Sequence, residues 1–257
     1  MRRQALTAVM LLACLAALTG LIYPFVVFGI GQAAFGHQVN GSFVTRNGVV
    51  VGSSLLGQNF LDAKGNPLPQ YFQPRPSDSL ESSYNAAGSA ASNLGPGDPR
   101  LVGFQPGLNT VDRNGNPSKT NVFATKADPY CVPTDPAGDP VIAPSAGQKY
   151  AKTKTGQYVC DPNTVLERAL AYRQLNGVPA ATKIPSDAVT ASGSGLDPDI
   201  SVANALLQAP RVARARHLPL ATVTAQVAKH TSGRTLGILG ERTVNVLDLN
   251  LALDQLR

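Results

Sequence analysis

Residues 5–30 read ALTAVMLLACLAALTGLIYPFVVFGI, and this apolar run near the start of the chain decides how the rest is organised. No Asp, Glu, Lys or Arg occurs between Arg3 and Arg46. At 1.5 Å per residue, the 24 residues from Ala5 to Phe28 span roughly 36 Å, which is more than the ~30 Å hydrocarbon core of a bilayer. The run therefore predicts a single membrane-spanning helix over residues 5–30.

Basic residues flank this run closely only at its start, and this asymmetry predicts the orientation of the chain. Arg2 and Arg3 precede it, and no Lys or Arg follows closely behind it. Short, positively charged flanks of a membrane helix stay in the cytoplasm. We therefore predict a single-pass protein of the cytoplasmic membrane, with residues 1–4 inside the cell and residues 31–257 forming an extracytoplasmic domain.

Two other kinds of N-terminal segment share part of this pattern. A cleaved signal peptide has an apolar core of only about 7–15 residues, whereas this run continues to Phe28 and beyond. The stretch from Leu11 to Cys14 resembles the cleavage box of a lipoprotein, but apolar residues rather than a polar tether follow Cys14. We therefore interpret the run as a retained anchor.

Small residues repeat at a spacing of four along the predicted span. Ala13 pairs in this way with Ala17, and Ala16 pairs with Gly20. Because close packing drives the association of helices in lipid, such pairs allow another membrane helix to approach. Alanine is also common in spans, and a spacing of four arises easily by chance. The spacing of these four residues therefore has two possible explanations, a face that packs against another helix and a chance pattern.

The rest of the chain carries the local signals of a loop-rich α+β domain. Only 15% of all residues are charged, and 24 glycines and 20 prolines interrupt the sequence often. Asn47-Gly48, which lies between β-forming residues, predicts a hairpin. Capping residues and apolar periodicity predict four helices, over residues 162–177 with Asp161 as the N-cap, 201–208, 210–216 and 219–230. A strand is predicted over residues 242–246, and it leads into a last helix.

Residues 97–160 predict a long irregular insertion in this domain. Prolines and turn motifs are frequent there, and no stretch sustains a helical or an alternating pattern. Cys131 and Cys160 fall in this region, on the side of the membrane where disulfides persist. A bond between them would close a loop of about 30 residues and stabilise the fold by about 3–4 kcal/mol in the chain-entropy model. Two unrelated thiols are the alternative.

The sequence contains none of the common motifs that identify an enzyme or a metal protein. It lacks a phosphate-binding P-loop, a zinc-binding pattern of histidines, a Cys-x-x-Cys pair and a nucleophile elbow. The net charge of +6 is spread without a run of Lys or Arg, and Trp is absent, which argues against a nucleic-acid binder. We expect no catalytic residue, no metal site and no nucleic-acid partner.

One cluster of small residues, Ser192-Gly193-Ser194-Gly195, differs from the other polar segments. Small side chains leave backbone N–H groups accessible, and such groups can form a nest for an anion. A tight loop, in which Asp197 and Pro198 arrange the start of the next element, accounts for the same residues. Motif content alone favours the loop, because glycine-rich patterns often arise without a ligand.

Several longer motifs follow one another in a recognisable order. The most specific are GSSLLGQNF at 52–60, YFQPRPS at 71–77, DAVTASGSGLDPDIS at 187–201, PRVARAR at 210–216 and VNVLDLNLALD at 244–254. Together they resemble the C-subunit family of the Kdp potassium-transporting P-type ATPases. The resemblance covers residues 19–96 and about 160–257, and the segment 97–160 is much longer than the family's usual spacer. Polar residues inside the matching motifs are candidates for structural or interface roles: Gln58, Asn59, Arg75, Ser92, Asn93, Asp197, Arg211 and Asn250.

This resemblance implies an accessory subunit rather than an enzyme. In the family, an A subunit admits potassium, a B subunit hydrolyses ATP, and a small F subunit helps to hold the complex. The C subunit is described as a catalytic chaperone that raises the ATP affinity of the B subunit and is needed for assembly. The resemblance thus implies the A, B and F subunits and the membrane as partners. It implies no cofactor bound by this chain alone, since the complex handles ATP and potassium.

The resemblance also implies a nucleotide contact at Ser192–Gly195, which is similar to a shortened signature loop of ABC-type ATPases. The predicted orientation puts this loop outside the cell, whereas ATP is bound inside. We therefore expect an indirect route, through packing of the span and through an outer domain seated at the potassium entrance. A membrane-anchored binding or sensory domain that works alone is the alternative function.

Overall fold

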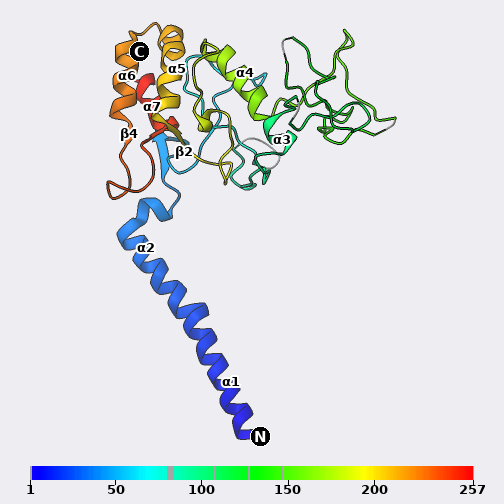
Figure 1. Ribbon diagram of the computed structural model, residues 1–257. Helices are drawn as coiled ribbons and strands as arrows, with labels where there is room; N and C mark the ends of the chain where they lie inside the picture. Colours follow the sequence, from blue (N-terminus) through cyan, green and yellow to red (C-terminus); the bar gives the residue numbers. More distant parts are fainter. Residues whose placement is uncertain (1, 80–83, 107, 127, 146, 257) are drawn as a thin grey trace. The chain divides into compact units, whose positions relative to one another are not determined.

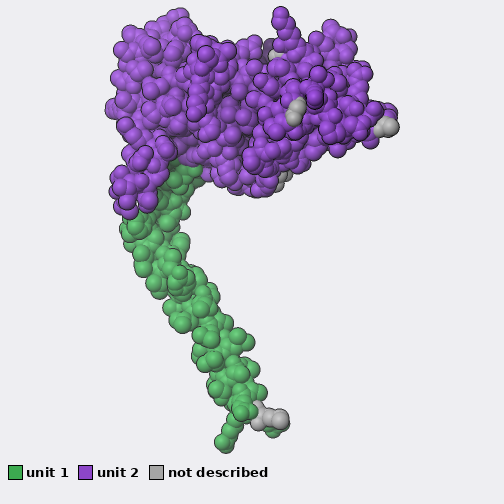
Figure 2. Space-filling model, in the orientation of Figure 1, with its two compact units in different colours: residues 1–55 green, residues 56–257 purple. Residues whose placement is uncertain are grey.

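The computed structural model describes residues 2–79, 84–106, 108–126, 128–145 and 147–256. The chain forms two compact units, residues 1–55 (unit 1) and residues 56–257 (unit 2), which Figure 2 shows in green and purple. Unit 1 contains the apolar run, and unit 2 contains the long motifs from Gly57 onwards.

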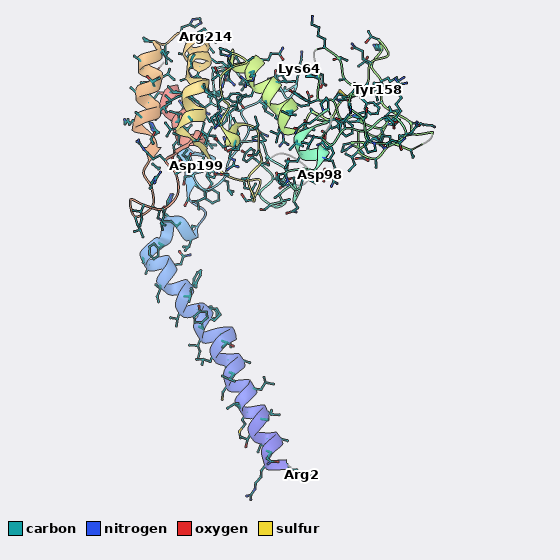
Figure 3. All side chains as sticks on the ribbon, viewed as in Figure 1. Arg2, Lys64, Asp98, Tyr158, Asp199 and Arg214 are labelled. Carbon is teal, nitrogen blue, oxygen red and sulfur yellow. A yellow bond between two sulfur atoms is a disulfide. The ribbon has the colours of Figure 1, made fainter. Side chains whose placement is uncertain are left out.

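Unit 1 consists mainly of one long helix that contains the apolar run. α1 (Arg2–Ala17) and α2 (Tyr23–Val39) are joined by a π-helical turn, η1 (Leu18–Ile22), so that helical structure continues for 38 residues. The described side chains of α1, η1 and α2 are not buried within this chain, and Figure 3 shows them projecting along the helix. By length and composition, the helix can cross a membrane.

The π-helical turn ends at Ile22, two residues before Pro24, whose ring nitrogen has no hydrogen to donate. The backbone N–H of Tyr23 donates to Leu18 O, five residues back, and the hydroxyl of Thr19 donates to Leu15 O at 2.7 Å. A π turn of this kind absorbs a local interruption of the α-helical hydrogen bonds. The helix therefore passes Pro24 and continues beyond residue 30 to a kink at Phe35, where the backbone is not helical, and a last helical stretch ends at Val39.

A β-hairpin completes unit 1. β1 (Phe43–Arg46) pairs antiparallel with β2 (Val49–Ser53). Asn47 and Gly48 connect the strands with φ values of 51° and 78°, in the left-handed region that Asn and Gly adopt most easily. The hairpin predicted from Asn47-Gly48 is confirmed.

The main core of unit 2 lies between a small sheet and three helices (Figure 1). β5 (Thr243–Asn245) is the central strand, with β3 (Asp199–Ser201) and β4 (Thr231–Ser232) antiparallel on either side of it. α5 (Val202–Arg216), α6 (Leu220–Lys229) and α7 (Val246–Asp254) supply most of the core. The class is therefore α+β, as predicted. The buried apolar residues are Phe72, Ile200, Ala205, Ala209, Val212, Ala213, Val223, Val227, Val244, Val246, Leu249 and Leu253.

The helix predicted to begin after Asp161 starts later. α4 runs from Val165 to Asn176, and its N-cap is Thr164, whose hydroxyl accepts from Glu167 N at 3.2 Å. The Asp161 carboxylate instead accepts from Asn163 N and forms a turn before the helix. The prediction that Asp161 is the N-cap is therefore wrong. Gly177, in the left-handed conformation, ends α4 as predicted.

The helix break predicted at Pro210 is also wrong. α5 runs through Pro210 without interruption, and Ser201, where a helix was expected to open, is its N-cap. A proline leaves the carbonyl four residues back without its donor. That carbonyl belongs to Leu206, whose side chain is exposed, so water can replace the lost bond on this side of the helix. Buried residues on the other side of α5 hold the helix together.

The described residues between 97 and 160 contain little regular structure beyond the short helix α3 (Pro99–Val102). They enclose a second, smaller core of four buried side chains, Phe104, Phe123, Cys131 and Val132. Cys131 and Cys160 are joined by a disulfide. Residues 97–160 thus form a folded segment with its own core, called the 97–160 lobe below.

Candidate functional site

The four residues Ser192–Gly195 lie in the loop between η2 (Ser186–Ala188) and β3, and their surroundings differ. Ser192 and Gly195 are buried, whereas Gly193 and Ser194 are exposed. The hydroxyl oxygens of Ser192 and Ser194 lie 3.3 Å apart. Two of the four residues can thus meet a ligand from solvent, and the other two belong to the packing of unit 2.

Gly195 is required by the packing of this loop. Its φ is 67°, and a Cβ at this position would lie 2.6 Å from Ala90 O and 2.9 Å from Ser79 N. Real Cβ atoms almost never approach other atoms so closely. At Gly193, in contrast, a Cβ would meet nothing within 4 Å. The glycine at 195 is therefore explained by the fold, whereas the glycine at 193 is not.

The backbone of the loop holds an earlier part of the chain. Ser194 O accepts from Ser89 Oγ at 2.9 Å and from Ala90 N at 3.1 Å, and Gly195 O accepts from Ser77 Oγ at 2.6 Å. The N–H of Gly195 donates to Ser192 O within the loop. An anion nest needs free N–H groups, and that of Gly195 is already in use. These contacts fit the interpretation as a tight loop.

An ion pair closes one side of the loop. Arg75 Nη1 donates to Asp197 Oδ2 at 2.9 Å, and Arg75 Nη2 donates to Ala191 O at 3.2 Å. The hydroxyl of Tyr84 donates to Arg75 O at 2.7 Å, and burial, followed by the charge of Asp197, raises the pKa of Tyr84. The guanidinium of Arg75 is thus neutralised by a carboxylate from this chain, which leaves it little charge for an external phosphate.

Polar side chains of α5 and α7 hold residues 68–73, a segment that turns at Pro69 and Gln70 and is called the strap below. Asn250 Oδ1 accepts from Phe72 N at 2.8 Å, and Asn250 Nδ2 donates to Phe72 O at 3.0 Å. Gln208 Oε1 accepts from Gln73 N at 2.8 Å, and its Nε2 donates to Gln73 O at 3.0 Å. The two side-chain amides thus pair with the strap as a neighbouring β-strand would.

Two arginines of α5 complete this arrangement. The buried guanidinium of Arg211 donates to Pro69 O at 2.6 Å and to Tyr71 O at 2.9 Å. Burial lowers the pKa of Arg211 to about 10, so the group keeps its charge at neutral pH. Arg216 donates to Gln70 O at 2.6 Å and forms an ion pair with Asp254 at 2.9 Å. These charges serve the internal carbonyls of unit 2.

A cleft of about 990 Å³ opens beside the same loop, lined by η2, β3 and β5. Charges of both signs line it, among them Lys183, Asp187, Asp199 and Arg242. Asp187 accepts from the backbone and side chain of Ser201, each at 2.8 Å, and Asp199 Oδ2 accepts from the Thr243 hydroxyl at 2.8 Å. Asp187 and Asp199 are therefore engaged in holding β3, β5 and the start of α5, whereas Glu241, which also lines the cleft, is exposed.

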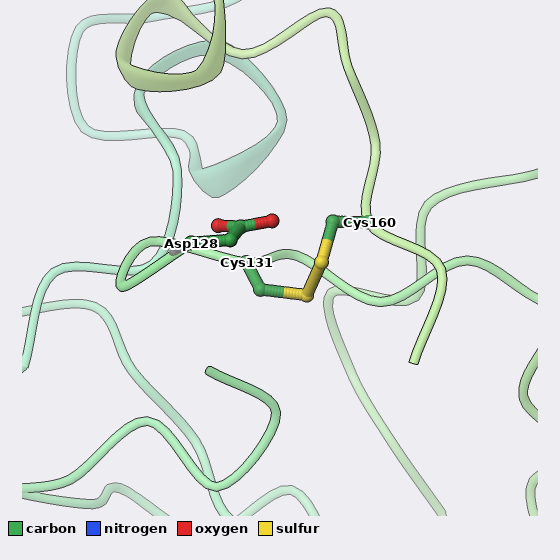
Figure 4. Close-up of side chains that lie close together, drawn as sticks. All are labelled: Asp128, Cys131 and Cys160. Atoms are coloured by element: carbon green, nitrogen blue, oxygen red, sulfur yellow. A yellow bond between two sulfur atoms is a disulfide. The ribbon is translucent and has the colours of Figure 1, made fainter. Parts of the chain in front are cut away.

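One group of acidic and cysteine side chains among the described residues has the proximity of a metal site (Figure 4). Asp128, Cys131 and Cys160 place their ligand atoms within 4.8 Å of one another. Metal binding by cysteine requires thiolates, and both sulfurs are consumed by the disulfide. The group therefore does not fit a metal ion.

The small residues of the span lie on the N-terminal helix. Ala13, Ala16 and Ala17 belong to α1 and Gly20 belongs to η1, and all four are exposed. A Cβ at Gly20 would meet no atom of this chain within 4 Å. A packing face at these residues remains a prediction about a partner helix.

Several polar residues that hold unit 2 together did not stand out in the sequence. Asn204 and Gln208, for example, are buried and joined by a hydrogen bond of 2.9 Å from Gln208 Nε2 to Asn204 Oδ1. With Arg211 they follow a spacing of four and three residues, which puts them on one face of α5. A polar stripe beside buried alanines was the signal that could have identified them.

Comparisons with known proteins agree with one another. Residues 5–121 and 117–255 match the family KdpC, described as "K+-transporting ATPase, c chain". The potassium-transporting ATPase KdpC subunit of Mycobacterium tuberculosis is 41% identical over 256 residues, which is 100% of both chains and includes the 97–160 lobe. The KdpC subunit of Gemmatimonas aurantiaca is 39% identical, over 97% of this chain and 91% of the relative. That of Ralstonia nicotianae is 38% identical, over 97% and 90%. The chain described here, with its apolar N-terminal helix and its α+β unit, belongs to the KdpC family of K+-transporting ATPase subunits.

Proposed function

We propose that this chain is the accessory, non-catalytic subunit of an ATP-driven, high-affinity potassium uptake complex. The observation that carries the proposal is the alignment with KdpC subunits over the whole length of the chain. In this role the chain acts as a catalytic chaperone, which raises the affinity of the ATP-hydrolysing B subunit for ATP and supports assembly with the A, B and F subunits. The complex, rather than this chain alone, handles ATP and potassium.

Polar side chains of the described residues bond with other parts of this chain, and this supports the proposal that the subunit is non-catalytic. Arg75 and Asp197 pair with each other, and Arg211 and Asn250 hold the strap. A catalytic group needs to reach a reacting atom in a substrate. These four groups are instead used to connect segments of unit 2 that are far apart in the sequence.

The proposed orientation puts the N-terminus in the cytoplasm and unit 2 outside the cell. Arg2 and Arg3 precede the apolar helix, and basic flanks stay in the cytoplasm. The disulfide Cys131–Cys160 supports the same orientation, because disulfides persist in oxidising compartments. Under this orientation, the loop at Ser192–Gly195 and the ATP site of the complex lie on opposite sides of the membrane.

We therefore propose that the chain affects ATP affinity indirectly. The small residues Ala13, Ala16, Ala17 and Gly20 would pack against a partner helix, and unit 2 would sit at the potassium entrance. Photo-crosslinking of the intact complex with an azido-ATP tests this route. Label on the B subunit alone is the expected result, and label within residues 190–198 of this chain, in vesicles of verified orientation, would contradict it.

Copurification is the experiment that tests the subunit role. The full chain, tagged at its C-terminus, is extracted in mild detergent from cells grown at low potassium. The expected result is recovery of a P-type ATPase together with the chain, and loss of growth at low potassium when the gene is deleted. Recovery of the chain alone, with unchanged growth of the deletion strain, would contradict the role and favour a stand-alone binding or sensory domain.

A further inference from the structure

The loop between β4 and β5 exposes three large aliphatic side chains at one tip. Leu236, Ile238 and Leu239 are 86%, 75% and 55% exposed. The tip is the segment 235–240, and Figures 1 and 2 show the loop after β4 projecting from the body of unit 2. Elsewhere the same sheet buries its aliphatic residues, such as Ile200 and Val244, in the main core.

This tip has a defined backbone conformation. Thr235 N donates to Leu239 O and Leu239 N donates to Thr235 O, both at 2.9 Å, so the tip is closed as a small antiparallel turn. Leu236 has a φ of 53°, in the left-handed region that leucine rarely adopts. The chain thus accepts an unfavourable backbone conformation at the residue whose aliphatic side chain is most exposed.

The charges around the tip follow the pattern of a segment that enters a membrane surface. Residues 235–240 contain no charged side chain, and the exposed residues Arg234 and Arg242 stand on its two sides. An aliphatic group flanked by basic residues buries its apolar part at the level of the headgroups and upper acyl chains, while the basic side chains reach the lipid phosphates. Glu241, beside Arg242, is the acidic residue of the loop.

Two further observations favour lipid over a protein surface. Protein interfaces derive most of their affinity from Trp, Tyr and Arg anchors, and leucine is under-represented among them. The large side chains of the tip are all aliphatic, and the segment 235–240 contains neither an aromatic residue nor an arginine. The chain also carries its own membrane-spanning candidate. Ser54 N donates to Ser42 O at 3.1 Å and closes the base of the β1–β2 hairpin. The hairpin therefore adds little length to the connection between the helix and unit 2. Outside the hairpin, this connection has about six residues, or about 20 Å at full extension.

We propose that the 235–240 tip inserts into the interfacial layer of the lipid bilayer that the N-terminal helix crosses, with Arg234 and Arg242 at the lipid phosphates. The covalent connection between the helix and unit 2 raises the effective concentration of the tip at the bilayer, so that weak insertion is sufficient. This proposal rests on the membrane span of the proposed function but not on its role in transport. The vesicle assay below contains only this chain, so the two can fail separately.

The absence of tryptophan from the chain allows a direct test. The full chain carrying L236W is reconstituted into vesicles of phosphatidylcholine and phosphatidylglycerol, with or without bromine on the acyl chains. The expected result is a blue-shifted emission that brominated lipid quenches, more strongly from shallow than from deep positions, because an interfacial segment reaches only about 5–10 Å. I238W provides a second reporter if L236W does not fold.

Leu108 provides a matched control, since it is as exposed as Ile238, at 75%, but lies in the 97–160 lobe. L108W is expected to emit like water-exposed tryptophan and to resist quenching. Replacing Arg234 and Arg242 by glutamine should reduce the quenching of L236W in vesicles with anionic lipid. Equal emission and equal resistance to bromine in L236W, I238W and L108W would overturn the proposal. Protection of L236W only when ATPase subunits are present would overturn it as well, in favour of a protein surface.

Discussion

Gly193 and Gly195 stand two residues apart in one loop, but a methyl group at each would meet different surroundings. G195A combines a left-handed φ with a Cβ only 2.6 Å from Ala90 O, so it should destabilise unit 2 by at least about 1–2 kcal/mol. G193A adds a methyl group in open space and should change stability by less than about 0.5 kcal/mol. Thermal unfolding of the full chain in detergent measures both. An equal loss in the two variants would contradict the structural role of Gly195.

Asn250 is the residue whose removal should affect the strap most directly. N250A removes the partners of both Phe72 N and Phe72 O, and two buried backbone groups left without partners cost about 2–5 kcal/mol. N114A is the matched control, because Asn114 is exposed in a turn. Urea unfolding should show a large loss for N250A and a change below about 0.5 kcal/mol for N114A. Unchanged stability of N250A would mean that the strap does not depend on this amide.

For single residues, candidates for structural or interface roles could be chosen from the sequence, but the residues that they contact could not be predicted. Arg75, Asp197, Arg211 and Asn250 could be selected because they are polar residues inside recognisable motifs. Their contacts join positions more than a hundred residues apart, such as Arg75 with Asp197 and Phe72 with Asn250. No local pattern contains that information, since it arises only when the tertiary structure brings the segments together.

Helix α4 carries the side chain with the clearest pH dependence. The pKa of Glu167 is raised to about 8, mainly because the side chain is buried. A hydrogen bond with Asp128, the charge of Asp128 and the charge of Asp161 raise this pKa further. Glu167 Oε1 and Asp128 Oδ1 are both buried without another donor, as expected if the Glu167 carboxyl group holds a proton. Between pH 4.5, the ordinary value, and about 8, the folded chain therefore binds a proton that the unfolded chain has lost. Its free energy of unfolding falls as pH rises through this window.

E167Q should remove this dependence, because glutamine resembles the protonated carboxyl group. Compared with the parent chain, we expect little change in the unfolding midpoint at pH 5, a higher midpoint at pH 8, and a flatter profile between them. E241Q, at an exposed glutamate, serves as the control. A profile for E167Q as steep as that of the parent chain would show that Glu167 does not hold the proton.

The disulfide should stabilise the 97–160 lobe more than any other part of the chain. Replacing Cys131 and Cys160 together by serine opens a loop of about 30 residues and should cost about 3–4 kcal/mol in the chain-entropy model. Limited proteolysis is expected to cut first within residues 97–160. C14S, which changes the unpaired cysteine of α1, is the control. Proteolysis that begins in the main core instead would contradict an independent contribution from the lobe.

At the scale of elements, local signals predicted local structure well and failed where packing dominates. Asn47-Gly48 predicted the hairpin, Gly177 the end of α4 and Pro219 the start of α6, because each acts through its own backbone. Pro210 did not end α5, because the buried face of the helix outweighs one lost hydrogen bond. The second core around Phe104 and Phe123 could not be predicted, since its residues follow no period.

At the scale of the whole molecule, the chain combines an apolar helix with an α+β unit whose polar groups serve mainly its own fold. This combination agrees with the accessory role proposed above, in which the chain acts through contacts with partners. The candidate loop at Ser192–Gly195 illustrates the point. Its glycine at 195 and its carbonyl groups are explained by packing, so a nucleotide is not needed to account for them.

The most direct test of this account is the ATP dependence of potassium-stimulated hydrolysis, measured on the transport complex purified with and without this chain. We predict that the complete complex hydrolyses ATP with a lower apparent KM, and that complexes lacking the chain either need more ATP or fail to assemble. Adding G193A in place of the parent chain should leave the apparent KM unchanged, since that glycine lies in open space. An identical rate and an identical apparent KM with and without the chain would contradict the account.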